Sequence, residues 1–288
     1  MMFDSWLSWI LLSSFCLSMY DLCKKASVRN NAVFPTLFVT TFSAWAAVTL
    51  YLVFSGSLSK MFVVSPKGVS FLFLKSCIVS ASWTATYLAL RTLPITSAAP
   101  IRATGPLWTL IGAVLIFAEV PNFVQAIGMV LVLAGCTFFS ISSHRDKREG
   151  GFKAICYAFI GTVLGSCSAL YDKHLLQSLN LEPIIVLWWF LAGMTIIYTI
   201  AAIFNHRGFK WRWTMPLVGI LLALTDTCYF NAISIPDAKI SVLSLIRRSS
   251  IIITFFVGGA LFHERDIKRK ALALAAILIG VVLLCVFS

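Results

Sequence analysis

The sequence predicts an all-α integral membrane fold in which ten transmembrane helices form two inverted five-helix repeats. Three observations lead to this prediction: an apolar composition, ten apolar runs of membrane-spanning length, and a residue pattern that occurs once in each half. The chain of 288 residues is 59% hydrophobic and 12% charged. Soluble domains carry about 25% charged residues, so this chain cannot cover a water-facing surface. A soluble enzyme, a disordered chain and a fibrous protein are therefore excluded.

Each of the ten runs approaches the roughly 20 residues that a helix needs to cross the hydrocarbon core. They are too continuous to be the short alternating strands of a barrel, and no gap between them could hold a soluble domain. The first run has neither a basic n-region nor a small-residue cleavage site, so we expect it to be a retained span. The predicted spans are residues 3–22, 34–55, 70–90, 97–118, 122–143, 154–172, 183–204, 214–233, 238–261 and 270–287.

A polar gap divides the chain into a first repeat at 1–143, a basic connecting loop at 144–153 and a second repeat at 154–288. Because each half has five spans, the second half must enter the membrane in the opposite orientation. Inverted repeats are typical of transporters with a substrate site near the midplane, although a duplication could also do no more than double a stable bundle. The residues that recur in the same order are Cys16 and Cys167, Tyr20 and Tyr171, Asp21 and Asp172, Tyr87 and Tyr229, Pro94 and Pro236, Arg102 and Arg247, Glu119 and Glu264, and Gly135 and Gly280.

Diffuse motifs near the ends of the spans carry a family resemblance. They are Ala89–Pro94, Pro106, Phe117–Glu119 and Gly135 in the first half, and Asn231–Pro236, Phe262–Glu264 and Gly280 in the second. With these motifs the chain resembles the drug/metabolite transporter superfamily, specifically its EamA-like ten-span branch. The second copy departs from the family pattern at Ile251, where a proline is usual.

The resemblance implies a ten-helix basket around a central cavity, lined mainly by spans one, three, four, six, eight and nine. It also implies secondary transport of small organic metabolites without an ATPase part, and the sequence contains no P-loop.

Beyond the first two residues of each predicted span, four basic residues lie inside the spans: Lys75, Arg102, Arg247 and Arg248. We expect Lys75, near the start of its span, to extend to the membrane interface. An arginine near the middle of a span costs about 2.5–3.5 kcal/mol to insert. The equivalent positions of Arg102 and Arg247 predict that both face the central space. Because Arg247 and Arg248 diverge by about 100° on a helix, one should face the cavity and the other a partner.

Guanidinium groups bind carboxylate and phosphate in a forked geometry, so the arginines predict an anionic substrate such as an organic phosphate or carboxylate. Arg247 and Arg248 also resemble the basic pair that relatives carrying phosphorylated sugars have in span nine. The alternative is that these arginines form internal ion pairs that only fix the helix packing.

Three aspartates are candidate coupling or gating residues: Asp226, Asp21 and Asp172. Asp226 lies deep in span eight and is the best candidate partner for Arg247 or Arg248; alternatively, it takes up a proton during transport. Asp21 and Asp172 end spans one and six, where a carboxylate can be solvated as an ordinary helix-end charge. Their recurrence after a tyrosine in both halves also fits a gate or coupling site.

Four aromatic side chains are predicted to line the cavity, where they would either stack against a substrate or serve only as packing: Tyr87, Tyr229, Trp83 and Trp108. We predict no cofactor and no metal site. The eight cysteines include no CxxC pair, and the histidines fall at or near segment ends.

The sequence thus predicts a secondary transporter, not an enzyme, that moves a small anionic organic metabolite across a membrane by alternating access. The alternative is a flippase for a lipid-linked, phosphate-bearing substrate. Expected partners are the small-molecule substrate, the lipid bilayer, and a coupling proton or counter-substrate; an oligomer is not required. The net charge of +12 is assigned to contact with anionic lipid headgroups and not to nucleic acid.

We expect a multi-pass protein of the bacterial inner (plasma) membrane. Its orientation is predicted in two opposite ways. Most Lys and Arg residues between the runs lie in the odd-numbered gaps, and the positive-inside rule then places both termini outside. The family resemblance implies cytoplasmic termini.

Overall fold

All regular secondary structure in the part of the chain that the structure describes is helical, as predicted. The structure is a computed structural model, and it describes residues 6–105, 107–108, 111–112, 115, 122–142, 151–173, 175, 179, 181–233, 247, 250–263 and 267–286. No β-strand occurs within these ranges. The helices are α1 (Trp6–Val28), α2 (Val33–Phe54), the 3-10 helix η1 (Leu58–Phe62), α3 (Pro66–Thr92), α4 (Ile95–Ala103), α6 (Phe123–Ser142), α8 (Gly151–Lys173), α9 (Pro183–Phe204), α10 (Thr214–Ile233), α12 (Ser250–Leu261) and α13 (Ile267–Val286).

Each predicted span overlaps one of these α-helices, but the predicted end of the first span was wrong. Helix α1 continues to Val28 instead of ending at residue 22. For the fourth and ninth spans, α4 and α12 cover only the first and last parts, respectively, and much of the remainder lies outside the described residues. Lys24, which is discussed below, lies in the extension of α1.

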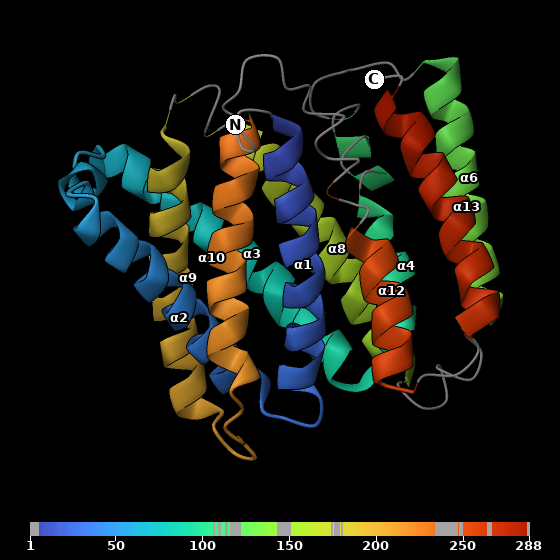
Figure 1. The fold of residues 1–288 in the computed structure, drawn as a ribbon, viewed down its shortest axis with the longest axis horizontal. Coiled ribbons are helices and arrows are strands. Elements are labelled where there is room, and N and C mark those ends of the chain that lie inside the picture. The colour runs from blue at the N-terminus through green and yellow to red at the C-terminus, as the bar shows by residue number, and fades with distance from the viewer. Residues whose placement is uncertain are drawn as a thin grey trace.

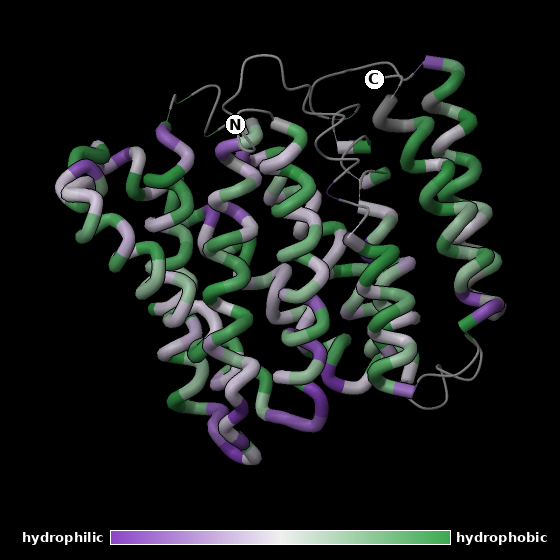
Figure 2. Tube along the Cα trace, viewed as in Figure 1, coloured by the Kyte–Doolittle hydropathy of each residue, from purple (hydrophilic) through white to green (hydrophobic). Residues whose placement is uncertain are grey.

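Four of the described helices, α2, α3, α8 and α9, are long and apolar enough to cross a membrane. Large apolar side chains are exposed on the outside of the bundle, including Phe54, Phe123 and Phe204. Figure 2 shows that hydrophobic residues cover most of the helix length, while many of the hydrophilic residues lie at the helix ends and turns. This surface is the one expected of a helical membrane protein, because lipid tails are as apolar as the exposed side chains and can contact them without cost.

The main helix contacts join the two halves of the chain. Helix α1 packs along α10, α3 along α8, α2 on α9, α6 on α13, and α4 on α12. Under the predicted correspondence of the halves, the α1–α10 contact maps onto the α8–α3 contact, and each of the other three pairs maps onto itself. The start of α1 and the end of α13 lie at the same end of the bundle (Figure 1).

Close helix approach depends on glycine where α8 meets α3. A Cβ atom on Gly161 would lie 2.5 Å from Thr86 Oγ1 and 3.1 Å from the Ser82 carbonyl oxygen. The Ser82 hydroxyl donates to the Gly161 carbonyl at 2.7 Å. Glycine therefore lets α3 and α8 approach closely enough for this hydrogen bond, as small residues do in membrane bundles.

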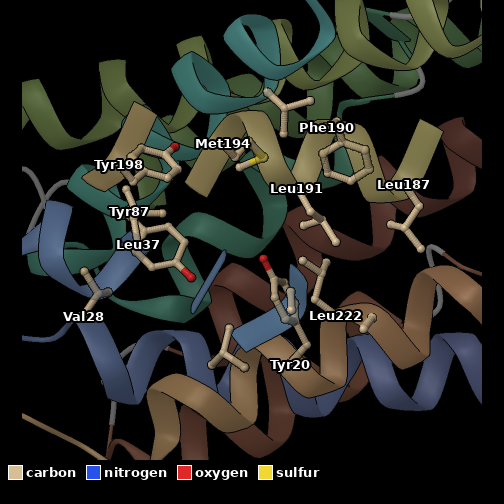
Figure 3. Packing of buried hydrophobic residues seen from close by; sticks show 14 of the residues in the cluster. Tyr20, Val28, Leu37, Tyr87, Leu187, Phe190, Leu191, Met194, Tyr198 and Leu222 are labelled. Carbon is tan, nitrogen blue, oxygen red and sulfur yellow. The ribbon is translucent and has the colours of Figure 1, made fainter. Parts of the chain in front are cut away.

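Two apolar clusters stabilise the bundle. The larger contains Tyr20, Tyr87 and Leu222, and Figure 3 shows part of it. The smaller lies among α4, α6, α12 and α13 and includes Phe255 and Ile277. Tyr20 also lines the cavity described next, so the larger cluster supports one side of the candidate site.

Candidate functional site

A cavity of about 320 Å³ lies among helices of both halves. Its lining comes from α1, α3, α4, α8 and α10, together with Gly105 and Arg247. These elements fall in spans one, three, four, six, eight and nine, which the family resemblance indicated. The polar and aromatic lining residues are Tyr20, Lys24, Ser82, Trp83, Thr86, Arg102, Thr162, Ser166, Ser168, Asp226 and Arg247. The described lining thus carries three cationic residues and one carboxylate.

Arg102, at the end of α4 as described, forms an ion pair with Asp21 of α1. Its Nη1 lies 2.7 Å from Asp21 Oδ1, and the two side chains are 25% and 1% exposed, respectively. The interpretation of Asp21 as a solvated helix-end charge was wrong, because α1 continues past it to Val28. Arg102 faces the cavity while its partner is buried behind it.

Arg247 forms a second ion pair, with Asp226 of α10. Arg247 Nη2 lies 2.5 Å from Asp226 Oδ1, and the side chains are 22% and 17% exposed. The guanidinium carbon lies 4.0 Å from the centre of the Tyr229 ring. Asp226 and Tyr229 are three residues apart on one helix, so both reach the same point. The predicted pairing of Asp226 with Arg247 is present; Arg248 lies outside the described residues.

Lys75 and Asp172 form a third ion pair, between α3 and α8. Lys75 Nζ lies 2.5 Å from Asp172 Oδ1, and the side chains are 4% and 35% exposed. Lys75 also donates to the Ser168 hydroxyl at 2.6 Å. The prediction that Lys75 extends to the membrane interface was wrong, because Asp172 and Ser168 provide partners inside the bundle. Neither Lys75 nor Asp172 is among the described lining residues of the cavity.

Sequence reasoning missed Lys24, because the first span was predicted to end before it. Lys24 lies on α1, lines the cavity and is 3% exposed. Its Nζ lies 5.1 Å from the ring centre of Tyr20, 5.4 Å from that of Trp83 and 4.8 Å from that of Tyr87. The spacing of Leu17, Tyr20 and Lys24 places all three on one helix face and is the signal that could have found it.

The four predicted aromatic residues differ in position. Trp83 lines the cavity, and Tyr87 is a buried residue stacked on it, with ring centres 6.3 Å apart. Tyr229 contacts Arg247, and Trp108 Nε1 donates to the Thr104 hydroxyl at 3.0 Å. Within the described lining of the cavity, only Trp83 of these four is present.

Hydroxyl groups also line the cavity. Ser82 donates to the Gly161 carbonyl, Thr162 to the Ala158 carbonyl at 2.8 Å, and Ser166 to the Gly105 carbonyl at 2.9 Å. Because each hydroxyl has a single hydrogen, these oxygens keep only acceptor capacity for any ligand in the cavity.

The fold and the cavity define a class of protein: a helical membrane protein whose two halves share a polar, positively charged internal site. Residues 4–141 match the model of the EamA-like transporter family. This match, over just under half of the chain, supports the drug/metabolite transporter superfamily and indicates an integral membrane protein that transports small solutes.

Comparison with solved structures extends the fold over the whole chain. One structure, described only as the crystal structure of a protein, has a TM-score of 0.65 and 14% sequence identity. The alignment covers 97% of this chain and 98% of that chain. At this identity the likeness shows the fold alone. A search of curated proteins found no match.

Proposed function

We propose that the protein is a secondary transporter that moves a small anionic organic metabolite across the membrane by alternating access. The observation that carries this proposal is the charge of the cavity, which Lys24, Arg102 and Arg247 line; Asp21 is paired with Arg102 and Asp226 with Arg247, so the cations outnumber the carboxylates by one among these described residues. Interior charges interact strongly because water does not screen them as in bulk. A cavity of this sign attracts an anion and rejects a cation of similar size.

Alternating access requires two halves that can move against each other around the site. The proposal takes these halves as the inverted repeats at 1–143 and 154–288, each with five spans. Two features support it: the main helix contacts run between the halves in a symmetric order, and the family model ends at residue 141. In transporters of this kind the substrate binds near the midplane between the repeats.

Each predicted site residue has a proposed role. Arg102, Arg247 and Arg248 attract the anionic group of the substrate, and Trp83 provides a flat apolar surface beside it. Asp226 either holds Arg247 in place or takes up a coupling proton. Other candidate contacts are Tyr87, Tyr229 and Trp108, and the candidate gating residues are Asp21 and Asp172. We place the protein in a bacterial plasma membrane, with the bilayer and a counter-substrate or coupling proton as further partners.

A thermal-shift screen of the purified protein tests the proposed substrate class. The panel contains phosphorylated sugars, nucleotides, carboxylates, amino acids and amines. We expect stabilisation by one class of anion, and its loss in the Arg102→Ala, Arg247→Ala double variant. Lys67→Gln, which removes an exposed cation at the start of α3, is the control and should respond as the wild type does.

Two results would contradict the proposal. Stabilisation by amines that persists in the double variant would reduce the arginines to packing residues. Stabilisation by lipid phosphates alone, with no transport of soluble anions into proteoliposomes, would favour the flippase alternative. Asp226→Asn separates the two roles of that residue: loss of pH dependence with binding retained indicates coupling, whereas loss of folded protein indicates pairing.

A further inference from the structure

We propose that Lys24 is the primary anion-binding group of the cavity and that it selects substrates carrying a single negative charge. This inference rests on the proposed function, and it names both a residue and a charge class that the sequence did not identify. The observation behind the proposal is that the three cations lining the cavity differ in their charged partners.

Two of the lining cations are already neutralised by carboxylates. Arg102 is paired with Asp21 at 2.7 Å, and Arg247 with Asp226 at 2.5 Å. Lys24 has no carboxylate oxygen within 4.0 Å among the residues that the structure describes. Each arginine pair contributes no net charge, so the described site carries one uncompensated positive charge when Lys24 is protonated. One negative charge balances it, whereas a second would be left unbalanced in a poorly solvated site.

The ammonium group of Lys24 retains hydrogen-bonding capacity. A lysine has three N–H donors, and the hydrogen bond found for Lys24 is a long one, to the Tyr20 hydroxyl at 3.4 Å. The faces of Tyr20, Trp83 and Tyr87 surround the rest of the group at about 5 Å. Ring faces attract a cation more weakly than a carboxylate does in a charge-assisted hydrogen bond. A carboxylate in the cavity would therefore bind Lys24 without having to displace another anion.

The next residue along the helix, Lys25, shows what a structural lysine in this fold does. Lys25 is also buried, at 4% exposure, and its Nζ donates to the carbonyl oxygens of Leu90 and Leu93 at the end of α3. A cation near the C-terminus of a helix satisfies carbonyls that have no partner within the helix. Lys25 does not line the cavity, whereas Lys24 does. The two adjacent lysines thus form a matched pair for an experiment.

The experiment measures binding to the purified full-length protein by isothermal titration and by thermal shift. The ligands are lactate, pyruvate and gluconate as monoanions, succinate and glycerol 3-phosphate as dianions, and lactamide as a neutral analogue. The variants are Lys24→Gln, Lys24→Met and Lys24→Arg, with Lys25→Gln as the control. Lys24→Met keeps an apolar side chain of similar length among the three rings, so it tests the charge even if Lys24→Gln does not fold.

We expect the wild type to bind at least one monoanion about tenfold or more tightly than any dianion. Loss of a hydrogen bond to a charged group should weaken monoanion binding roughly 10- to 100-fold in Lys24→Gln and Lys24→Met. Lys24→Arg should retain most of the affinity. Lys25→Gln should lower the melting temperature of the free protein but leave the affinity within about threefold, since a change below about 0.7 kcal/mol is expected away from the ligand.

Each contrary result would overturn a different part of the proposal. Unchanged monoanion affinity in Lys24→Met, or equal losses in the Lys24 and Lys25 variants, overturns the role of Lys24. Preference of the wild type for a dianion overturns the charge selection. If the wild type binds none of the anions and transports none in proteoliposomes, the proposed function itself fails.

Discussion

The ion pair between Asp21 and Arg102 predicts an asymmetric loss of stability when either partner is removed. Asp21 is 1% exposed, whereas Arg102 is 25% exposed and reaches the cavity. Arg102→Gln leaves a carboxylate buried without its counter-charge, and such a change costs about 3–5 kcal/mol of unfolding free energy. Asp21→Asn leaves a guanidinium that the polar cavity can solvate. Its cost should therefore fall in the range of about 1–2 kcal/mol expected for a lost partner.

The double variant Asp21→Asn, Arg102→Gln removes both charges and should recover much of the loss. We expect a coupling free energy of about 2 kcal/mol or more in the double-mutant cycle, since contacting residues commonly couple by 0.5–3 kcal/mol. Equilibrium unfolding in mixed micelles, followed by tryptophan fluorescence, measures each term. The pair of Arg247 and Asp226, at 22% and 17% exposure, serves as a control in which the two single losses should be similar.

Two results would refute this reasoning. If Asp21→Asn costs as much as Arg102→Gln, the burial of the carboxylate does not determine the penalty. If the double variant is as unstable as the sum of the single variants, the two residues do not interact in the folded protein. Either result would also weaken the argument that Arg102 is neutralised within the site.

Three further predictions concern packing and charge elsewhere in the bundle. Gly219→Ala should cost about 1–3 kcal/mol of unfolding free energy, because a Cβ atom there would lie 2.7 Å from a backbone nitrogen of α2; a neutral effect would contradict the close approach. Lys75→Met should lower the melting temperature by leaving Asp172 without its partner, while Lys75→Arg should not; equal effects would show that charge is unimportant there. Tyr229→Leu should leave the fold intact but remove the ring beneath Arg247, a contact worth about 0.5–2 kcal/mol; unchanged stability would exclude it.

The helical architecture could be predicted because a membrane-spanning helix requires a long run of apolar residues, which is easily recognised in the sequence. Each long apolar run overlaps a helix, and the scarcity of charges within the runs identified Asp226 as a partner for Arg247. The logic is physical: a charged group inside a membrane must find a counter-charge or a polar cavity. With few charges available, the number of possible pairs is small.

The pattern of apolar runs does not predict the end of a helix correctly where the helix continues through charged residues. Lys24 and Lys25 interrupt the apolar run, so the first span was predicted to end too early, although both side chains are buried by contacts with α3 and its aromatic residues. The partner of Lys75 was missed for a related reason. Asp172 is far away in sequence, and only the packing of α3 on α8 brings the two together. Composition shows that a charge needs a partner, but the tertiary fold decides which partner it has.

The two repeat-related aspartates allow a direct test of alternating access. Asp21 is 1% exposed and Asp172 is 35% exposed, although the proposed repeats place them at equivalent positions in the two halves. If inverted halves exchange conformations, a shift to the opposite state should expose the part of α1 around Asp21 and bury the end of α8 around Asp172. Asp21→Asn, Arg102→Gln removes a contact between α1 and α4 in the present state. Hydrogen exchange in lipid nanodiscs should then become faster in the α1 segment and slower in the α8 segment. Faster exchange in both segments would indicate general loosening instead, and it would count against an exchange of conformations between the halves.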